Sequence, residues 1–146
     1  MQVTSHSTLT LQTLAQQILF EGEHQELLEW LLPHCQLRHL PDGSVLLNPQ
    51  QTADQVFLIL EGEVEVRLGH RGGQIITTLG AGQCVGEMSV IEGAPPSAQV
   101  IARNACTAIT IEGAALRALL EHSRVFARNL VRLLARRLRY DNQLVR

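Results

Sequence analysis

Residues 86–98 bring together side chains that could contact a small ligand. Glu87 offers a carboxylate, and Ser89 and Ser97 offer hydroxyl groups. The chain shows no Walker-type loop, no nucleophile elbow, and no paired carboxylates at a predicted helix or strand end. A binding role is sufficient for both serines, so we expect a non-enzymatic protein without catalytic residues.

Histidine and cysteine side chains raise the question of a metal site. His34, Cys35 and His39 are close in sequence, but a strand boundary is expected between them, and no CxxC-type zinc spacing is present. We therefore expect no metal, haem or iron–sulfur site. The three cysteines are too few and too scattered for a disulfide framework, so we expect buried thiols in a reducing compartment.

The composition is that of one globular domain. The chain has 146 residues, of which 45% are hydrophobic and 18% are charged. Residues 1–10 lack the basic region and apolar run of a signal peptide or membrane span, so we expect a cytoplasmic protein. The net charge of -2 hides an asymmetry, because nine of the 14 acidic residues precede position 66 and eleven of the 12 arginines follow it. This split indicates that the two ends could pair, within one chain or between chains.

Apolar spacing predicts helices first, then strands. Residues 8–22 and 24–35 carry leucines at helical spacing, with a threonine N-cap at position 8 or 10 and Gly22 as a stop. From residue 36 to 111, short apolar runs alternate with turn signals at 41–43, 48–54, 61–63, 70–73 and 80–82. Such strands predict an antiparallel, jelly-roll-like β-barrel, and hence a mainly β fold with flanking α-helices.

The C-terminal part predicts a short helix over 112–120 and a long amphipathic helix from about Ser123 to the end. We expect the apolar face of the long helix to form a homodimer seam. The residues of that face are Phe126, Leu130, Leu133, Leu134 and Leu138. Arg137 interrupts the face, and we expect it to pair with Asp141 one turn further on.

A row of arginines follows the opposite face of the same helix. We expect it to be solvated or to pair with glutamates of the N-terminal part. The row consists of Arg124, Arg128, Arg132 and Arg136, and the glutamates are Glu21, Glu23, Glu26 and Glu29. We divide the chain into a helical extension (1–22), a barrel domain (23–122) and a dimerisation helix (123–146). No further helix pair follows, so we expect no helix-turn-helix for reading DNA.

Residues 23–140 resemble the cyclic nucleotide-binding domain family, the sensor module of catabolite activator-type regulators and of kinase regulatory subunits. The similarity rests on three ordered stretches: residues 40–66, with Gly43 and Gly62 at turns; residues 79–93; and residues 98–120. The second stretch resembles the phosphate-binding cassette of the family. The resemblance implies a regulatory protein with a cyclic nucleotide as ligand, a homodimer and a protein effector.

Within the cassette, the resemblance implies a role for each matched position. Gly86 allows close backbone approach, Glu87 accepts from the ribose hydroxyl, and Met88 and Ser89 open a short helix whose N–H groups favour an anion. Ser97 and Ala98 match the small residues that follow the phosphate arginine.

Pro96 stands where the family has that arginine. Proline supplies neither a charge nor an N–H group. Losing a buried charge-assisted pair costs about 2–5 kcal/mol, or roughly 30- to 4000-fold in affinity. Three readings stay open: ordinary cyclic nucleotide binding, a different ligand whose polar partners come from elsewhere, with Arg67, Arg71 and Arg103 nearest in sequence, or a ligand-free scaffold. In the absence of an arginine, we expect Glu87 to be exposed, protonated or bonded to N–H groups.

Overall fold

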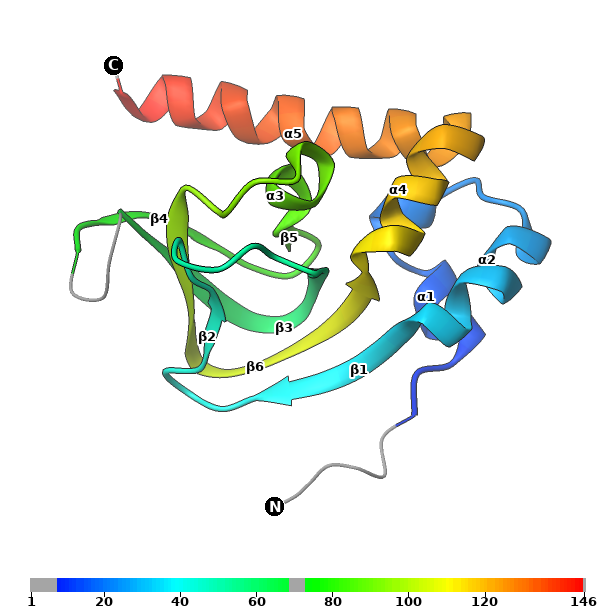
Figure 1. Cartoon of the computed structure of the whole chain (residues 1–146), viewed down its shortest axis with the longest axis horizontal. Helices are drawn as coiled ribbons and strands as arrows, with labels where there is room; N and C mark the ends of the chain where they lie inside the picture. Colours follow the sequence, from blue (N-terminus) through cyan, green and yellow to red (C-terminus); the bar gives the residue numbers. More distant parts are fainter. Residues whose placement is uncertain (1–7, 69–72, 146) are drawn as a thin grey trace.

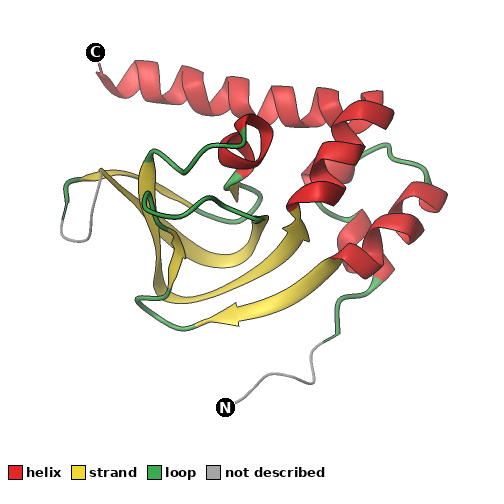
Figure 2. Cartoon of the chain, viewed as in Figure 1, coloured by secondary structure: helices red, strands yellow, loops and turns green. Residues whose placement is uncertain are grey.

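Helices gather along one side of a rolled antiparallel sheet (Figure 1, Figure 2). This computed structural model describes the backbone of residues 8–68 and 73–145, and the side chains of these residues up to 139. The helices are α1 (Leu11–Ala15), η2 (Ile18–Phe20), α2 (Gln25–Leu31), η3 (Leu32–His34), α3 (Glu87–Glu92), α4 (Gly113–His122) and α5 (Arg124–Val145). The strands are β1 (Cys35–Leu40), β2 (Val45–Leu47), β3 (Gln55–Leu68), β4 (Ile75–Leu79), β5 (Cys84–Val85) and β6 (Ala98–Glu112).

The two long strands β3 and β6 form the centre of the sheet. The main strand order is β1-β6-β3-β4, while β2 pairs with β6 and β5 pairs with β3. Every pairing among the described residues is antiparallel. The predicted fold class, mainly β with flanking helices and a long C-terminal helix, is confirmed.

The turn predicted at residues 61–63 is wrong. These residues lie inside β3, where the register against β6 shifts on both sides of Glu61. Gly62 has a φ of 85°, and a Cβ added there would lie 2.4 Å from the Ala105 carbonyl oxygen. The glycine therefore forms a bulge in a continuing strand. The two strands predicted between residues 98 and 111 likewise form one strand, β6, while the turn predicted at 70–73 falls largely outside the described residues.

The strand alternation sorts apolar side chains into two clusters. Val56 and Leu58 of β3 face the helices, whereas Phe57 and Ile59 face the interior of the roll. Both faces of this segment are buried, which explains why its sequence reads as an unbroken apolar run. The helical cluster also contains Leu14, so the N-terminal helices share one core with α4 and α5.

Both predicted N-caps are confirmed by hydrogen bonds. The Thr13 N–H donates to Thr10 Oγ1 at 3.1 Å, and the Phe126 N–H donates to Ser123 Oγ at 3.1 Å. The Ser123 hydroxyl also donates to Glu23 Oε2 at 2.5 Å, which joins the start of α5 to the segment before α2.

The predicted dimer face of α5 is corrected for three of its five residues. Phe126, Leu130 and Leu133 are buried in the chain's own core, and the Phe126 ring stacks on Phe20 at a centroid distance of 5.7 Å. The prediction failed because an amphipathic pattern does not say whether an apolar face meets its own chain or another. Leu134 is half-buried, and Leu138 is 63% exposed. No helix in the described part of the chain is both long and apolar enough to cross a membrane.

Asn129 joins α5 to the N-terminal helices by polar contacts inside this core. Its side-chain Nδ2 donates to the Leu19 carbonyl at 2.9 Å and to the Glu21 carbonyl at 3.0 Å. The residue is only 7% exposed. Shielded carbonyl oxygens need a hydrogen-bond donor, and the Asn129 amide supplies it to both. This amide therefore holds η2 against α5.

We predict that Asn129→Ala lowers the free energy of unfolding by about 1–3 kcal/mol, because two shielded carbonyls lose their donor. Urea denaturation followed by circular dichroism measures the change. The neighbouring Arg128→Ala is the control, since Arg128 is exposed and its loss should cost less than about 0.5 kcal/mol. Equal effects of the two variants would contradict this role of Asn129.

Candidate functional site

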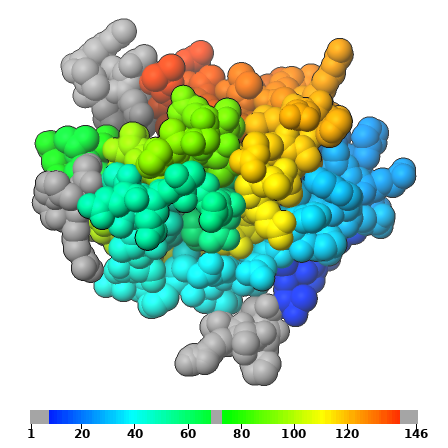
Figure 3. All heavy atoms as spheres, in the orientation of Figure 1, coloured from blue at the N-terminus to red at the C-terminus, as the bar shows by residue number. Residues whose placement is uncertain are grey.

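A pocket of about 290 Å³ lies between α3, the interior of the roll and α5. All seven residues predicted for the ligand site line it: Gly86, Glu87, Met88, Ser89, Pro96, Ser97 and Ala98. Its remaining walls are mostly apolar and come from β2, β3, β4, β5 and β6: Leu47, Val66, Ile76, Leu79, Val85 and Val100. In the space-filling view, the segment from α3 to β6 lies beneath α5 (Figure 3).

Gly86 begins α3 in a conformation that suits glycine. It has a φ of 95°, and an added Cβ would lie 3.0 Å from the Gln55 carbonyl oxygen. The backbone of the β5–α3 turn thus packs directly on β3. A side chain here would push α3 away from the sheet and open the pocket wall.

The hydroxyl of Ser89 is bound to the protein itself. It donates to the Ala94 carbonyl and accepts from the Ala53 N–H at 3.4 Å. Ser89 is 5% exposed, so it ties α3 to the loops on either side. Ser97, by contrast, is exposed at the pocket edge.

Glu87 is the buried carboxylate of the site. It is 4% exposed, and of the three alternatives expected for it the N–H contact is the one found: the Met88 N–H donates to Oε2 at 3.2 Å. The Cys84 thiol donates to Oε1 at 3.2 Å. An arginine, Arg137, lies 3.7 Å from Oε1 through its Nη1 atom. These groups compensate the burial of the charge.

Arg137 lines the pocket, although the sequence analysis did not place it in the ligand site. Its Nη2 donates to the Cys84 carbonyl at 2.6 Å and to Gln83 Oε1 at 2.9 Å, and its Nε donates to Gln83 Oε1 at 3.3 Å. The side chain of Asp141, the partner predicted for Arg137, lies outside the described residues. The signal was present, because an arginine interrupting an apolar helix face needs a polar partner beneath that face.

Of the three arginines named from the sequence as candidate ligand partners, Arg67 and Arg103 do not line the pocket. Arg67 donates to Glu65 Oε1 at 2.6 Å, and Arg103 lies 3.7 Å from Glu65 Oε2. Arg71 lies outside the described residues. Arg137 is therefore the only basic side chain among the described pocket residues.

All three cysteine side chains are buried thiols, as the sequence predicts. Burial, with a smaller effect of the Glu112 carboxylate, raises the pKa of Cys35 to about 12. Burial and then the Glu87 carboxylate raise the pKa of Cys84 well above its usual value. The Cys84 thiol consequently keeps its proton and can donate it to Glu87.

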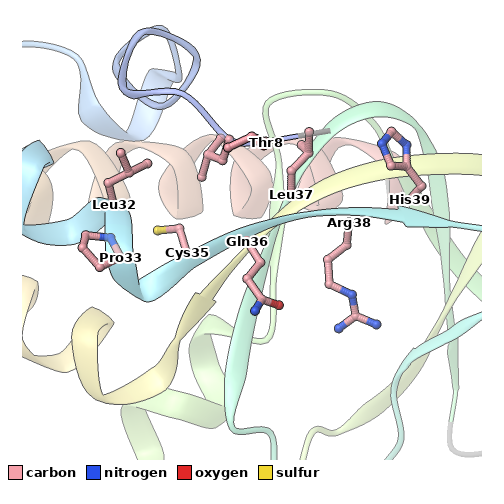
Figure 4. A pocket seen from close by; sticks show the side chains of 9 residues that line it. Thr8, Leu32, Pro33, Cys35, Gln36, Leu37, Arg38 and His39 are labelled. Atoms are coloured by element: carbon pink, nitrogen blue, oxygen red, sulfur yellow. The ribbon is translucent and has the colours of Figure 1, made fainter. Parts of the chain in front are cut away.

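A larger hollow, about 740 Å³, follows strand β1 on another part of the molecule. In the close-up, Cys35 and Leu37 point to one side of β1 while Gln36 and Arg38 point to the other (Figure 4). The polar groups therefore do not converge on one ligand. His34 and His39 contact Glu112 and Thr107, respectively, and residues 8–68 and 73–139 contain no group of three potential metal ligands.

We predict that Arg137→Met lowers the free energy of unfolding by about 2–4 kcal/mol, because Glu87 stays buried without its cation and the Cys84 carbonyl loses a donor. Urea denaturation measures this. Arg136→Met provides the matched control, since Arg136 is exposed and should contribute less than about 0.5 kcal/mol. Adding Glu87→Gln to Arg137→Met should restore part of the loss, and a purely additive double variant would argue against the pair.

We also predict that the three thiols resist a disulfide-exchange reagent in the native protein at mildly alkaline pH, because their raised pKa values leave little thiolate. All three should react on unfolding in urea. Rapid labelling of native Cys84 would show that the contact between α5 and the β5–α3 turn opens readily.

Known proteins resemble the chain over most of its length. It is 29% identical over 131 residues to the cAMP-activated global transcriptional regulator CRP of Salmonella typhimurium. The matched region covers 88% of this chain and 62% of that relative. It is 34% identical over 125 residues to the Pycsar effector protein XpPycTIR of Xanthomonas perforans, which covers 85% of this chain and 40% of the relative. The chain thus spans less than two thirds of these relatives.

A solved cyclic nucleotide-binding domain from Methylobacillus flagellatus superposes with a TM-score of 0.74 at 29% identity, covering 88% of this chain and 78% of that one. The family model for the cyclic nucleotide-binding domain matches residues 37–123, more than half of the chain. The resemblance inferred from the three ordered stretches is confirmed, and the chain belongs to the cyclic nucleotide-binding domain family.

Proposed function

We propose that this chain is a non-enzymatic, cytoplasmic regulatory domain that binds a small molecule in the pocket under α3 and binds cyclic nucleotides weakly. The observation that supports this best is the composition of the pocket wall. Pro95 and Pro96 line the pocket together with Glu87 and Arg137. The site keeps its shape and its carboxylate but lacks the cation that the family resemblance assigns to position 96.

Arg137 gives ligand binding a direct route to α5. The residue belongs to α5, and its partners Cys84 and Glu87 belong to β5 and α3, which both contribute residues to the pocket wall. A ligand that contacts Glu87 changes the charge balance around Arg137 and hence the hold of α5 on the barrel. This coupling needs no conformational change elsewhere.

The exposed side of α5 offers a surface for a homodimer. Val131 is 65% exposed and Leu138 is 63% exposed, and Leu134 lies between them, half-buried. Their spacing of three and four residues places them on one helical stripe. A dimer along this stripe would present the ligand-dependent position of α5 to an effector protein.

Ordinary cyclic nucleotide binding is the second candidate, because it is favoured by family membership and by the presence of all seven cassette positions in the pocket. It requires a cation to replace the missing one. Arg137 is the described basic residue of the pocket, and its donors are already largely engaged.

We predict that cyclic AMP and cyclic GMP raise the melting temperature of the wild-type protein little, and that Pro96→Arg produces a saturable rise. A restored arginine adds a charge-assisted pair of about 2–5 kcal/mol, or roughly 30- to 4000-fold in affinity. Thermal-shift titrations measure both, with cyclic di-GMP as a third ligand.

A saturable shift of the wild type at low ligand concentration would favour the second candidate and overturn the weak binding proposed here. The control for Pro96→Arg is Ala94→Arg, which adds the same charge at an exposed position outside the pocket. A gain in both variants would show nonspecific attraction of the phosphate.

A further inference from the structure

The pocket carries more negative than positive charge. Its ionisable lining residues among the described part of the chain are Glu87, Glu92 and Arg137. Two carboxylates thus face one guanidinium. A ligand with a negative charge would add a third anion beside the buried Glu87, which is unfavourable unless new donors offset it.

Three of the five N–H groups of this guanidinium form hydrogen bonds to the protein. Its Nη2 holds the Cys84 carbonyl at 2.6 Å, and both Nη2 and Nε hold Gln83 Oε1. The remaining nitrogen, Nη1, faces Glu87 Oε1 at 3.7 Å. A bound phosphate would have to take this nitrogen from a carboxylate that is itself buried, and Glu87 would then lose its compensation.

Backbone donors around the pocket are also reduced. The Met88 N–H at the start of α3 already donates to Glu87 Oε2 at 3.2 Å. Pro95 and Pro96 have no N–H at all. The Ser89 hydroxyl is bound between the Ala94 carbonyl and the Ala53 N–H. The donors named here are therefore absent or occupied, which leaves the Ser97 hydroxyl at the exposed pocket edge.

The same features suit a molecule without charge. A carboxylate has about four acceptor positions, and the described contacts of Glu87 use one on each oxygen, so it can accept further hydroxyl donors. The walls opposite are apolar, with Val66, Leu79 and Val100 among them. They can cover the face of a heterocycle or another flat apolar group.

We infer that the natural ligand of this pocket is an uncharged molecule with adjacent hydroxyl groups and an apolar ring, the chemical class of the ribonucleosides, and that a phosphate on such a molecule opposes binding. This inference rests on the proposed function, because it names the ligand class of the same pocket. The site selects against the phosphate through Pro96, the occupied donors and the two carboxylates.

Isothermal titration calorimetry of the full chain tests this with matched pairs: adenosine against cyclic AMP, and guanosine against cyclic GMP. In the wild type, at least one nucleoside should bind about tenfold or more tightly than its own cyclic monophosphate. Pro96→Arg should reverse that order, and Ala94→Arg should leave it unchanged. The 2′-deoxynucleoside should bind more weakly than the preferred nucleoside, because it removes one hydroxyl donor to Glu87.

The possible results separate the inference from the function on which it rests. Tighter binding of a cyclic nucleotide than of its nucleoside to the wild type would overturn the inference and leave a ligand-binding regulatory domain. Binding of neither class to the wild type would overturn both. A preferred nucleoside whose affinity is insensitive to the 2′-hydroxyl would remove Glu87 from the recognition and contradict the inferred class.

Discussion

The buried carboxylate of Glu87 is the constraint on which the site depends. A charge at 4% exposure must be compensated from nearby, and this chain does so with a thiol, an amide and a guanidinium from three different segments. To satisfy it, the β5–α3 turn has to pack on β3 and α5 has to lie across α3 (Figure 1). Pocket shape and helix position therefore have the same physical origin.

This arrangement explains why the residue at position 96 matters for ligand choice. With a second basic residue free of protein partners, the pocket could still attract an anion in the absence of an arginine at position 96. Here the remaining arginine already serves Glu87 and the Cys84 carbonyl. The lining therefore holds two carboxylates, one arginine and apolar walls, and on this basis we propose a neutral hydroxyl-bearing ligand.

The helix α5 combines two tasks that a sequence pattern does not separate. Its inner face completes the core through Phe126, Leu130 and Leu133, and its outer face retains Val131 and Leu138 in solvent. The arginine row between these faces is exposed, and none of the ion pairs found among the described side chains joins it to the N-terminal glutamates. Among the described side chains, the acidic N-terminal part and the arginine row of α5 thus do not pair with each other.

The sequence by itself determined the fold class, the helix cap at Ser123, and the gathering of residues 86–98 into one site, because local periodicity, capping chemistry and an ordered family pattern act over short distances. It left the first cap open between Thr8 and Thr10, and the structure decided for Thr10. From the sequence, Gly62 was predicted to lie in a turn, whereas the structure has a bulge there. Both features can require a glycine with a positive φ. Only the tertiary structure decided that Arg137 reaches Glu87 and that Phe126 faces its own core. Those contacts join residues 50 positions apart in the first case and 106 in the second, and no local pattern encodes which surface a buried face or a buried charge will meet.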